Sequence, residues 1–385
     1  MNDTDLSGKP LTPRPAFVLN KWQKRQATLL NHFSSLDYLK GLKRLLDDFV
    51  NGVDVTLGLA ERQGRDELIV NKRWGMRDTA ANFGTYGFPA LREFQKSVAK
   101  QIAQLANDYY HATGFIQCAR LLDELSLGWS TPEEEARFKA GLATIGKYVD
   151  PLDTTMEHAW NDNRFTRFQE RNPDLLPRIG KFRVRTGVEG ESGKLPPRSG
   201  IYVPQDDPYG ALQFAWTGNN DGRLFDCSTF NELGLKAIAL VGREALWTDD
   251  PRLLALVKQA PYLAAFKARR FPIESEQEYL ADPANATVLI SVAGVTDRPC
   301  KWYLVEHIEG EFDDEADLEE PAGAIESHRS NVPAGQPCPE AGWWFTPAAA
   351  GSRRFFRQGE RMPDAGGAYG ETFWQWDRDQ SAPSL

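Results

Sequence analysis

Residues 337–377 read PCPEAGWWFTPAAAGSRRFFRQGERMPDAGGAYGETFWQWD and hold four of the chain's eleven tryptophans. The four lie in two pairs, Trp343 with Trp344 and Trp374 with Trp376, and glycine and proline residues separate the pairs. Aromatic side chains suit the half-buried surface of a sheet, and glycine and proline suit tight turns. The stretch therefore predicts a small unit of short strands. It supplies no nucleophile, metal cage or phosphate cradle, which favours recognition over catalysis.

The rest of the chain has the composition of an ordinary globular protein. Its 385 residues are enough for two or three domains that each bury a core. We find neither an N-terminal apolar signal nor an apolar run long enough to span a membrane, so we expect no membrane partner. Four widely spaced cysteines fit neither a disulfide framework nor a paired metal motif. These features favour the cytoplasm.

The net charge of −9 is unevenly distributed along the chain. Residues 1–180 hold 24 Lys and Arg against 23 Asp and Glu, whereas residues 181–385 hold 21 against 31. Nucleic-acid binding requires clusters of Lys and Arg to meet phosphates. The acidic second half therefore argues against a nucleic-acid partner and favours a basic one.

Residues 1–177 are predicted to form an all-helical domain. Apolar residues recur at helical spacing after residue 36 and again after Pro89, and Ser130–Glu135 combines a hydroxyl cap, a first-turn proline and three acids. Gly52 and Gly58 are expected to end the second helix, and residues 64–89 to form an irregular loop. A further helix is expected to open at residues 153–155.

Residues 178–385 are predicted to form a mixed domain, which makes the fold class α+β. Residues 181–188 alternate as a strand, and helices are expected over 229–245, 250–270 and 274–281. The apolar run 286–293 is predicted to be a strand that forms a hairpin with 302–305. The Gly- and Trp-rich β unit closes this domain.

An acidic block occupies residues 306–326, with ten Asp and Glu and no Lys or Arg. Such a block repels itself and is expected to be an exposed arm. It offers either a solubilising surface or a means of steering a cationic partner.

Catalytic and cofactor motifs are not found in the sequence. The five histidines are scattered and form no zinc-ligand spacing, and no nucleophile elbow, P-loop or dinucleotide fingerprint occurs. We therefore expect no catalytic residue, no metal site and no cofactor.

The C-terminal stretch resembles the polymorphic-toxin immunity protein 71 and 72 families, which are found beside type VI secretion effectors. The resemblance rests on CPxxGWW at residues 338–344, on GSRRFF followed by QGExMP at 351–363, and on the Gly-rich turn before WQW. It covers about the last fifty residues, and a helical N-terminal region is consistent with it.

This resemblance implies a cytoplasmic antidote that binds a cognate toxin, of the DNase class, and blocks it stoichiometrically without catalysis. Acidic side chains suit that task because they can occupy a groove built for phosphates. The hypothetical partner-binding residues are Asp313, Asp314, Glu315, Asp317, Glu319, Glu320, Trp343 and Trp344. The motif residues have an alternative role, which is to hold the small β unit together.

Two other functions stay open on the sequence. One is a sugar- or peptide-binding module without catalysis, for which sugar binding would need coplanar exposed tryptophans. The other is an enzyme of unrecognised type centred on the loop 64–89, whose Arg and Asp residues fit a structural ion-pair network better. Those residues are Arg65, Asp66, Arg73, Arg77 and Asp78.

Overall fold

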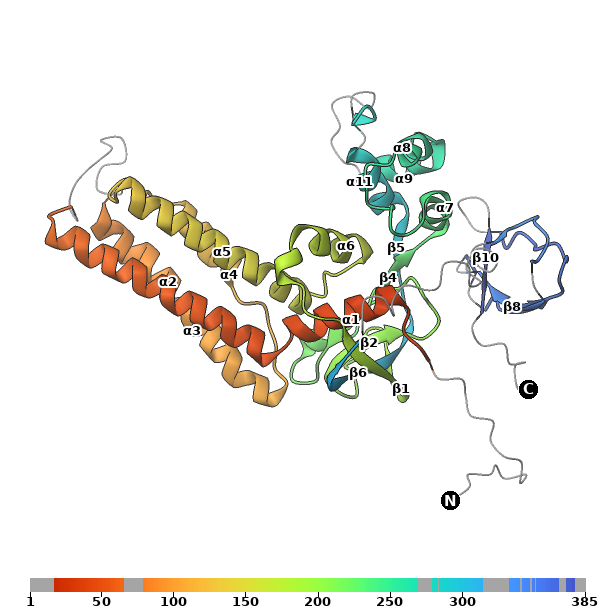
Figure 1. Cartoon of the computed structure of the whole chain (residues 1–385), viewed down its shortest axis with the longest axis horizontal. Coiled ribbons are helices and arrows are strands. Elements are labelled where there is room, and N and C mark those ends of the chain that lie inside the picture. Colours follow the sequence, from red (N-terminus) through yellow and green to blue (C-terminus); the bar gives the residue numbers. More distant parts are fainter. Residues whose placement is uncertain are drawn as a thin grey trace, which may run out of the picture.

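The protein is described here by a computed structural model. It describes residues 17–65, 79–268, 279–282, 284–313, 332–339, 341–346, 348–349, 351–366 and 372–377. Figure 1 shows an arm of long helices, a sheet at its base, a lobe of short helices beside the sheet, and a small β unit at the C-terminal side. This arrangement confirms the α+β class, with helices first and a mixed region after them.

Six α-helices precede the sheet in the described part of the chain. Five of them follow a residue whose side chain caps the first turn, and the one after Gly114 has no side-chain cap. Two of the caps are capping boxes: Asn20 with Gln23, and Thr131 with Glu134. The second box lies in the Ser130–Glu135 stretch that the sequence marked as a helix start. The helices are α1 (Lys21–Phe33), α2 (Leu36–Arg62), α3 (Ala80–Gln104), α4 (Phe115–Asp123), α5 (Pro132–Met156) and α6 (Asp162–Arg171).

The predicted helix end at Gly52 and Gly58 and the predicted loop at residues 80–89 are both wrong. At the two glycines, tertiary packing outweighs the poor helix propensity of glycine. Helix α2 continues through Gly52 and Gly58, since its buried stripe runs from Tyr38 to Ala60. A glycine costs a helix about 1 kcal/mol relative to alanine, less than one well-buried leucine contributes. Residues 80–89, expected in a loop, form the start of α3 after the Thr79 cap. Residues 66–78 lie outside the described part.

The expected helix start at residues 153–155 is also wrong. These residues form the last turn of α5, where all three are buried. Asp153 accepts hydrogen bonds from the backbone N–H of Thr113 at 2.7 Å and from its hydroxyl at 2.9 Å. Asp153, which looked like part of a cap, therefore binds the loop before α4, and the Thr155 hydroxyl donates to the Pro151 carbonyl within α5. The next helix begins at its own cap, Asn161.

A four-stranded antiparallel sheet lies at the base of the arm, in the order β1-β6-β2-β3. The strand predicted over 181–188 is confirmed as part of β1, and residues 302–305 belong to β6. Their bounds are β1 (Gly180–Glu191), β2 (Gly200–Pro204), β3 (Gln213–Ala215) and β6 (Lys301–Phe312).

Helix α1 packs on this sheet through polar as well as apolar side chains (Figure 1). The Gln26 side-chain oxygen accepts a hydrogen bond from the Leu212 N–H at 3.0 Å. The Thr28 hydroxyl accepts one from the Gly180 N–H at 3.1 Å. Both partners are buried backbone groups that would otherwise lose their hydrogen bonds. These contacts fix α1 in register with the sheet.

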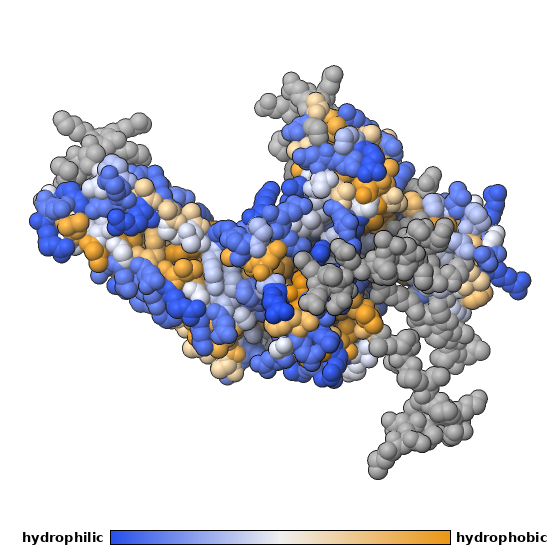
Figure 2. Space-filling view, in the orientation of Figure 1, coloured by the Kyte–Doolittle hydropathy of each residue, from blue (hydrophilic) through white to orange (hydrophobic). Residues whose placement is uncertain are grey.

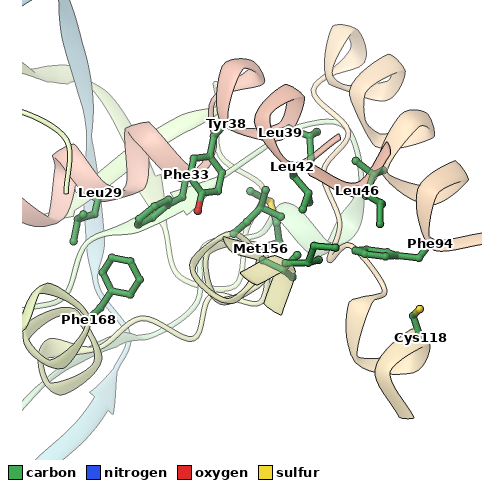
Figure 3. Packing of buried hydrophobic residues seen from close by; sticks show 14 of the residues in the cluster. Leu29, Phe33, Tyr38, Leu39, Leu42, Leu46, Phe94, Cys118, Met156 and Phe168 are labelled. Atoms are coloured by element: carbon green, nitrogen blue, oxygen red, sulfur yellow. The ribbon is translucent and has the colours of Figure 1, made fainter. Parts of the chain in front are cut away.

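The largest hydrophobic core includes residues from both sides of the predicted domain boundary at 177/178. Helical residues such as Phe33 and Leu46 share one cluster with Ile201, Phe214 and Val305 of the sheet. Figure 3 shows the helical part of this cluster, where Tyr38, Leu42 and Leu46 of α2 lie in line toward Phe94. The change from helical to mixed structure falls near residue 178, but packing does not separate the two parts there.

The chain enters and leaves the lobe of short helices through two paired strands, β4 (Cys227–Phe230) and β5 (Val295–Arg298). Between them the chain forms α7 (Glu232–Val241), α8 (Pro251–Val257), α9 (Ala260–Ala268) and α11 (Ala284–Ala293). The predicted helix over 229–245 is therefore a strand followed by a helix. The predicted helix over 250–270 is two helices, α8 and α9, with a break at residues 258–259, and residues 269–270 lie outside the described part. Most of 274–281 lies outside the described residues.

The predicted strand over 286–293 is wrong, since this run belongs to α11. Helix α11 packs against α7, α8 and α9, and six of its residues are buried. A helix buried on several sides reads as a continuous apolar run, as a buried strand does. The hairpin partner expected for residues 302–305 is thus replaced by β1 and β2.

A buried ion pair joins the lobe to the arm. The carboxylate of Asp162, the first residue of α6, binds the Arg243 guanidinium and accepts a hydrogen bond from Trp247 Nε1 at 2.8 Å. Both charged side chains are less than 10% exposed, at 8% and 7%. Figure 2 shows a hollow between the arm and the lobe, on the side of α6.

We predict that Asp162→Ala lowers the free energy of unfolding by about 3–5 kcal/mol, because it leaves a buried guanidinium without its counter-charge. Chemical denaturation followed by circular dichroism measures the change. Glu93→Ala is the control: it breaks a pair with Lys96 whose side chains are both 72% exposed, and we expect a change within about 0.5 kcal/mol. Equal effects of the two substitutions would contradict the structural role of Asp162.

Candidate partner-binding surface

The C-terminal β unit is built from the stretch that the sequence singled out. Its strands form an antiparallel sheet in the order β7-β10-β8-β9. They are β7 (Val332–Pro333), β8 (Gly342–Phe345), β9 (Arg354–Phe356) and β10 (Phe373–Trp376). The expectation of short strands joined by turns is confirmed for the described residues. Figure 1 shows this unit at the end of the molecule opposite the helical arm.

The two adjacent tryptophans of β8 have different environments because successive strand residues point to opposite faces. Trp344 is fully buried and makes an edge-to-face contact with Trp376, with ring centroids 5.2 Å apart. Phe356 and Trp374 make a similar contact at 4.7 Å in the same cluster. The burial of Trp344 makes it a core residue of the unit, and its contact with a partner stays a prediction.

Trp343 lies on the outer face, directly opposite Phe355 of β9. The two rings are 5.8 Å apart and almost perpendicular, at 74°. Phe355 is 49% exposed and Trp343 is half-buried. The Arg353 guanidinium lies 4.5 Å from the centre of the Trp343 ring and forms an ion pair with Asp377. We call Trp343, Arg353 and Phe355 the aromatic–arginine patch.

Ion pairs and hydrogen bonds hold the turn after β9 in place. The Glu360 carboxylate accepts the Arg357 N–H at 2.9 Å and a hydrogen bond from Arg354 at 3.1 Å. The Arg357 N–H first, and Arg354 in addition, hold the pKa of Glu360 below its usual value. Arg354 also lies over Phe356, at 4.2 Å, on the core side. Of the two adjacent arginines, one therefore supports the core and the other belongs to the patch.

The acidic block is in part already neutralised. Glu306 of β6 pairs with Arg185 and Arg198, and Glu311 pairs with Lys181. Asp313 pairs with Lys24 of α1 at 2.6 Å, and its backbone N–H donates to Ile179. These carboxylates tie β6 to β1 and to α1. Asp313 thus makes a structural contact, and its role in steering stays a prediction.

The other predicted acidic contacts lie outside the described residues. They are Asp314, Glu315, Asp317, Glu319 and Glu320. Their role in binding stays a prediction.

Several titratable side chains of the described residues make structural contacts. No group of three His, Cys, Asp or Glu residues there could hold a metal ion. His158 stacks on Trp216, and burial lowers its pKa to about 4. Arg65, at the start of the suspected loop, binds both oxygens of Glu134 at 3.1 Å, which fits the ion-pair interpretation. Asp66, Arg73, Arg77 and Asp78 lie outside the described part.

Comparisons with protein-family models, with curated proteins and with solved structures find no match to this chain. Among the helices of the described part, none is long and apolar enough to cross a membrane. The resemblance to the immunity protein families therefore rests on the motif residues alone. The structure gives several of these residues a role in the packing of the β unit.

Sequence reasoning named Trp343 among the partner-binding residues and gave no role to its neighbour Arg353. Because side chains alternate between the two faces of a strand, the sequence GWWF already predicts that Trp343 and Trp344 lie on opposite faces. It does not predict which of the two side chains faces the core. That choice depends on the pairing of β8 with β9 and β10, which follows from contacts between distant residues.

We predict that Trp344→Ala destabilises the β unit far more than Trp343→Ala does. Removing a fully buried tryptophan costs about 3–5 kcal/mol, whereas removing a half-buried one costs about 1–2 kcal/mol. Amide hydrogen exchange in β8 and β10 measures the local stability of each variant. Similar losses of protection in the two variants would contradict the assignment of opposite faces.

Proposed function

We propose that this chain is an immunity protein, which binds a cognate secreted toxin and neutralises it by stoichiometric occlusion. The observation that carries the proposal is the aromatic–arginine patch. Tryptophan, tyrosine and arginine supply most of the binding energy at protein interfaces, usually inside a polar rim. Here Phe355 is 49% exposed beside an arginine that lies over a tryptophan.

The patch is suited to binding because much of it is already ordered. The Trp343 and Phe355 rings are held by paired strands, and Arg353 is oriented by Asp377. An ordered patch loses less side-chain entropy when a partner docks. The resemblance of the same stretch to the immunity families supports a toxin as that partner. The resemblance also implies that the toxin is a type VI effector of the DNase class and that the chain acts in the cytoplasm. Both statements are part of the proposal.

A protein that blocks a toxin by occlusion must bind the toxin tightly, and fast association makes the block more effective. In this proposal the patch supplies the affinity. The acidic residues after Asp313 would supply steering, since the second half of the chain carries the excess negative charge. A DNase presents a basic cleft to its substrate, so an acidic antidote would approach it favourably. Binding would then weaken as salt screens the charges.

The alternative function, a sugar-binding module, receives less support from the patch. Sugar platforms are formed by exposed rings that lie in one plane, whereas Trp343 and Phe355 are at 74° to each other. A perpendicular pair fits an irregular protein surface better than the flat face of a sugar ring. Peptide binding without toxin neutralisation stays the second possibility for the same surface.

The test uses the full chain and the product of the neighbouring gene, made as a catalytically inactive protein. We expect one-to-one binding whose Kd rises with salt, measured by calorimetric titration at two salt concentrations. Phe355→Ala should raise Kd by about 30-fold or more, the effect of losing an interface hot spot. The control is Phe225→Ala, because Phe225 is 53% exposed in another part of the molecule.

The outcomes separate the function from the surface. The proposed function is wrong if the two wild-type proteins do not associate at micromolar concentrations. If they associate and Phe225→Ala weakens binding as much as Phe355→Ala does, the function stands and the assignment of the patch is wrong.

A further inference from the structure

A pocket lies at the junction of the arm and the sheet, where α1 ends and α2 begins (Figure 1). It has a volume of about 410 Å³, enough for a small organic molecule. Residues of α1, α2 and α5 form one wall, which we call the arm wall. Residues of β1, of the segment just before it and of β6 form the other, the sheet wall. The pocket shares no residue with the aromatic–arginine patch.

Aromatic rings form much of the lining. On the arm wall the Tyr38 and Tyr148 rings stack with their centroids 4.2 Å apart. Each hydroxyl donates to the backbone carbonyl of the other residue, at 2.8 and 3.1 Å. Because both hydroxyl hydrogens are used in this way, the pair offers the pocket mainly ring surface. Phe182 and Phe312 add ring surface from the sheet wall.

Two histidines, one from each wall, offer ring nitrogens to the pocket. The His32 ring of α1 lies 4.9 Å from the Tyr38 ring, and the His307 ring of β6 lies 5.3 Å from that of Phe182. His307 also lies against Gly180, where a Cβ would come within 3.0 Å of its ring. Among the described residues, the ring nitrogens of both histidines have no hydrogen-bond partner, and they are not among the polar atoms closed off from solvent. A bound molecule can therefore reach them.

The two walls also carry opposite charges. Arg178 lies on the sheet wall just before β1, and Asp37 lies on the arm wall in the first turn of α2. The Arg178 guanidinium lies 4.3 Å from the centre of the Phe312 ring. This contact uses the face of the guanidinium and leaves the N–H groups at its edge free. Within the described part of the chain, neither Arg178 nor Asp37 forms an ion pair, with each other or with any other residue.

Charged residues next in sequence to the lining are, in contrast, paired outside the pocket. The pairs are Lys147 with Asp174, Lys181 with Glu311, and Asp313 with Lys24. Burial lowers the pKa of His32, so its ring is uncharged near neutral pH. The unpaired charges at the pocket are therefore a cation on the sheet wall and an anion on the arm wall. A ligand with one charge would meet a like charge on one wall, whereas a ligand with both charges can pair with both.

We propose that this pocket binds a small zwitterion with an aromatic ring, which is the chemistry of a free aromatic amino acid. Its carboxylate accepts hydrogen bonds from Arg178, its ammonium group pairs with Asp37, and its ring lies against the aromatic lining. His32 and His307 hydrogen-bond to the same polar groups, since a neutral imidazole has one donor and one acceptor. This binding site goes beyond toxin neutralisation and does not depend on it.

The test titrates the full-length protein with L-phenylalanine and follows binding by ligand-observed NMR. We expect saturable binding at one site. N-acetyl-L-phenylalanine lacks the positive charge, and L-phenylalaninamide lacks the negative one. Each should bind at least about 10-fold more weakly, the loss expected for one hydrogen bond to a charged group.

Two variants assign the ends of the ligand to the walls. Arg178→Gln should raise the Kd for L-phenylalanine about 10-fold because it removes the partner of the carboxylate. It should not weaken the binding of L-phenylalaninamide, which has no carboxylate. Asp37→Asn should likewise weaken the binding of L-phenylalanine and should not weaken that of the N-acetyl derivative.

Each variant has a matched control outside the pocket. Arg92 also lies over a phenylalanine, with its guanidinium 5.0 Å from the Phe88 ring, and Asp54 is an exposed aspartate of the same helix as Asp37. Neither residue lines the pocket. Arg92→Gln and Asp54→Asn should therefore bind L-phenylalanine with the Kd of the wild type. Melting temperatures of all four variants check that each is folded.

Three results would overturn the proposal. The first is a wild-type protein that shows no saturable binding of L-phenylalanine. The second is N-acetyl-L-phenylalanine or L-phenylalaninamide binding as tightly as L-phenylalanine, since the site would then not recognise both charges. The third is an equal Kd in Arg178→Gln and Arg92→Gln, which would place the ligand elsewhere. None of these results bears on toxin binding, which is measured separately.

Discussion

The guanidinium of Arg243 holds together segments that are distant in the sequence. It pairs with Asp162 at the start of α6, lies 5.0 Å from the Trp22 ring of α1 and 5.4 Å from the Tyr209 ring, and reaches the Pro208 carbonyl at 3.4 Å. A buried charge is tolerated only where it is paired and hydrogen-bonded. The arm, the sheet and the lobe therefore depend on one another for their positions, because each supplies part of this environment.

Helix α1 extends that dependence to the sheet. Its buried Gln26 and Thr28 satisfy backbone N–H groups of the sheet, and Lys24 neutralises Asp313 at the end of β6. Changes at α1 should thus be felt in both the arm and the sheet. The C-terminal β unit has a core of its own, around Trp344 and Phe356. The arm and the sheet share a core, and the lobe has another. A small, separately packed unit on such a scaffold can present a binding surface without large rearrangement of the whole.

The sequence predicted much of the architecture where local signals agree with packing. The cap at Thr131 and the alternation in β1 are signals of this kind, and both elements form. Long-range packing decided the rest. Helix α2 passes Gly52 because its other face is buried, and α11 replaces a predicted strand because three helices surround it. For the site, the sequence identified the β unit, whereas only strand pairing shows that Trp343 faces outward.

The central claim is that the aromatic–arginine patch is the face that meets the partner, and side-chain oxidation by hydroxyl radicals tests it most directly. The chain would be footprinted alone and with the inactive product of the neighbouring gene, and oxidation read residue by residue by mass spectrometry. The account predicts that oxidation of Phe355 and Trp343 falls severalfold in the complex while that of Phe225 is unchanged. Protection of Phe225 or of Tyr86 on the arm, with Phe355 still fully reactive, would contradict it.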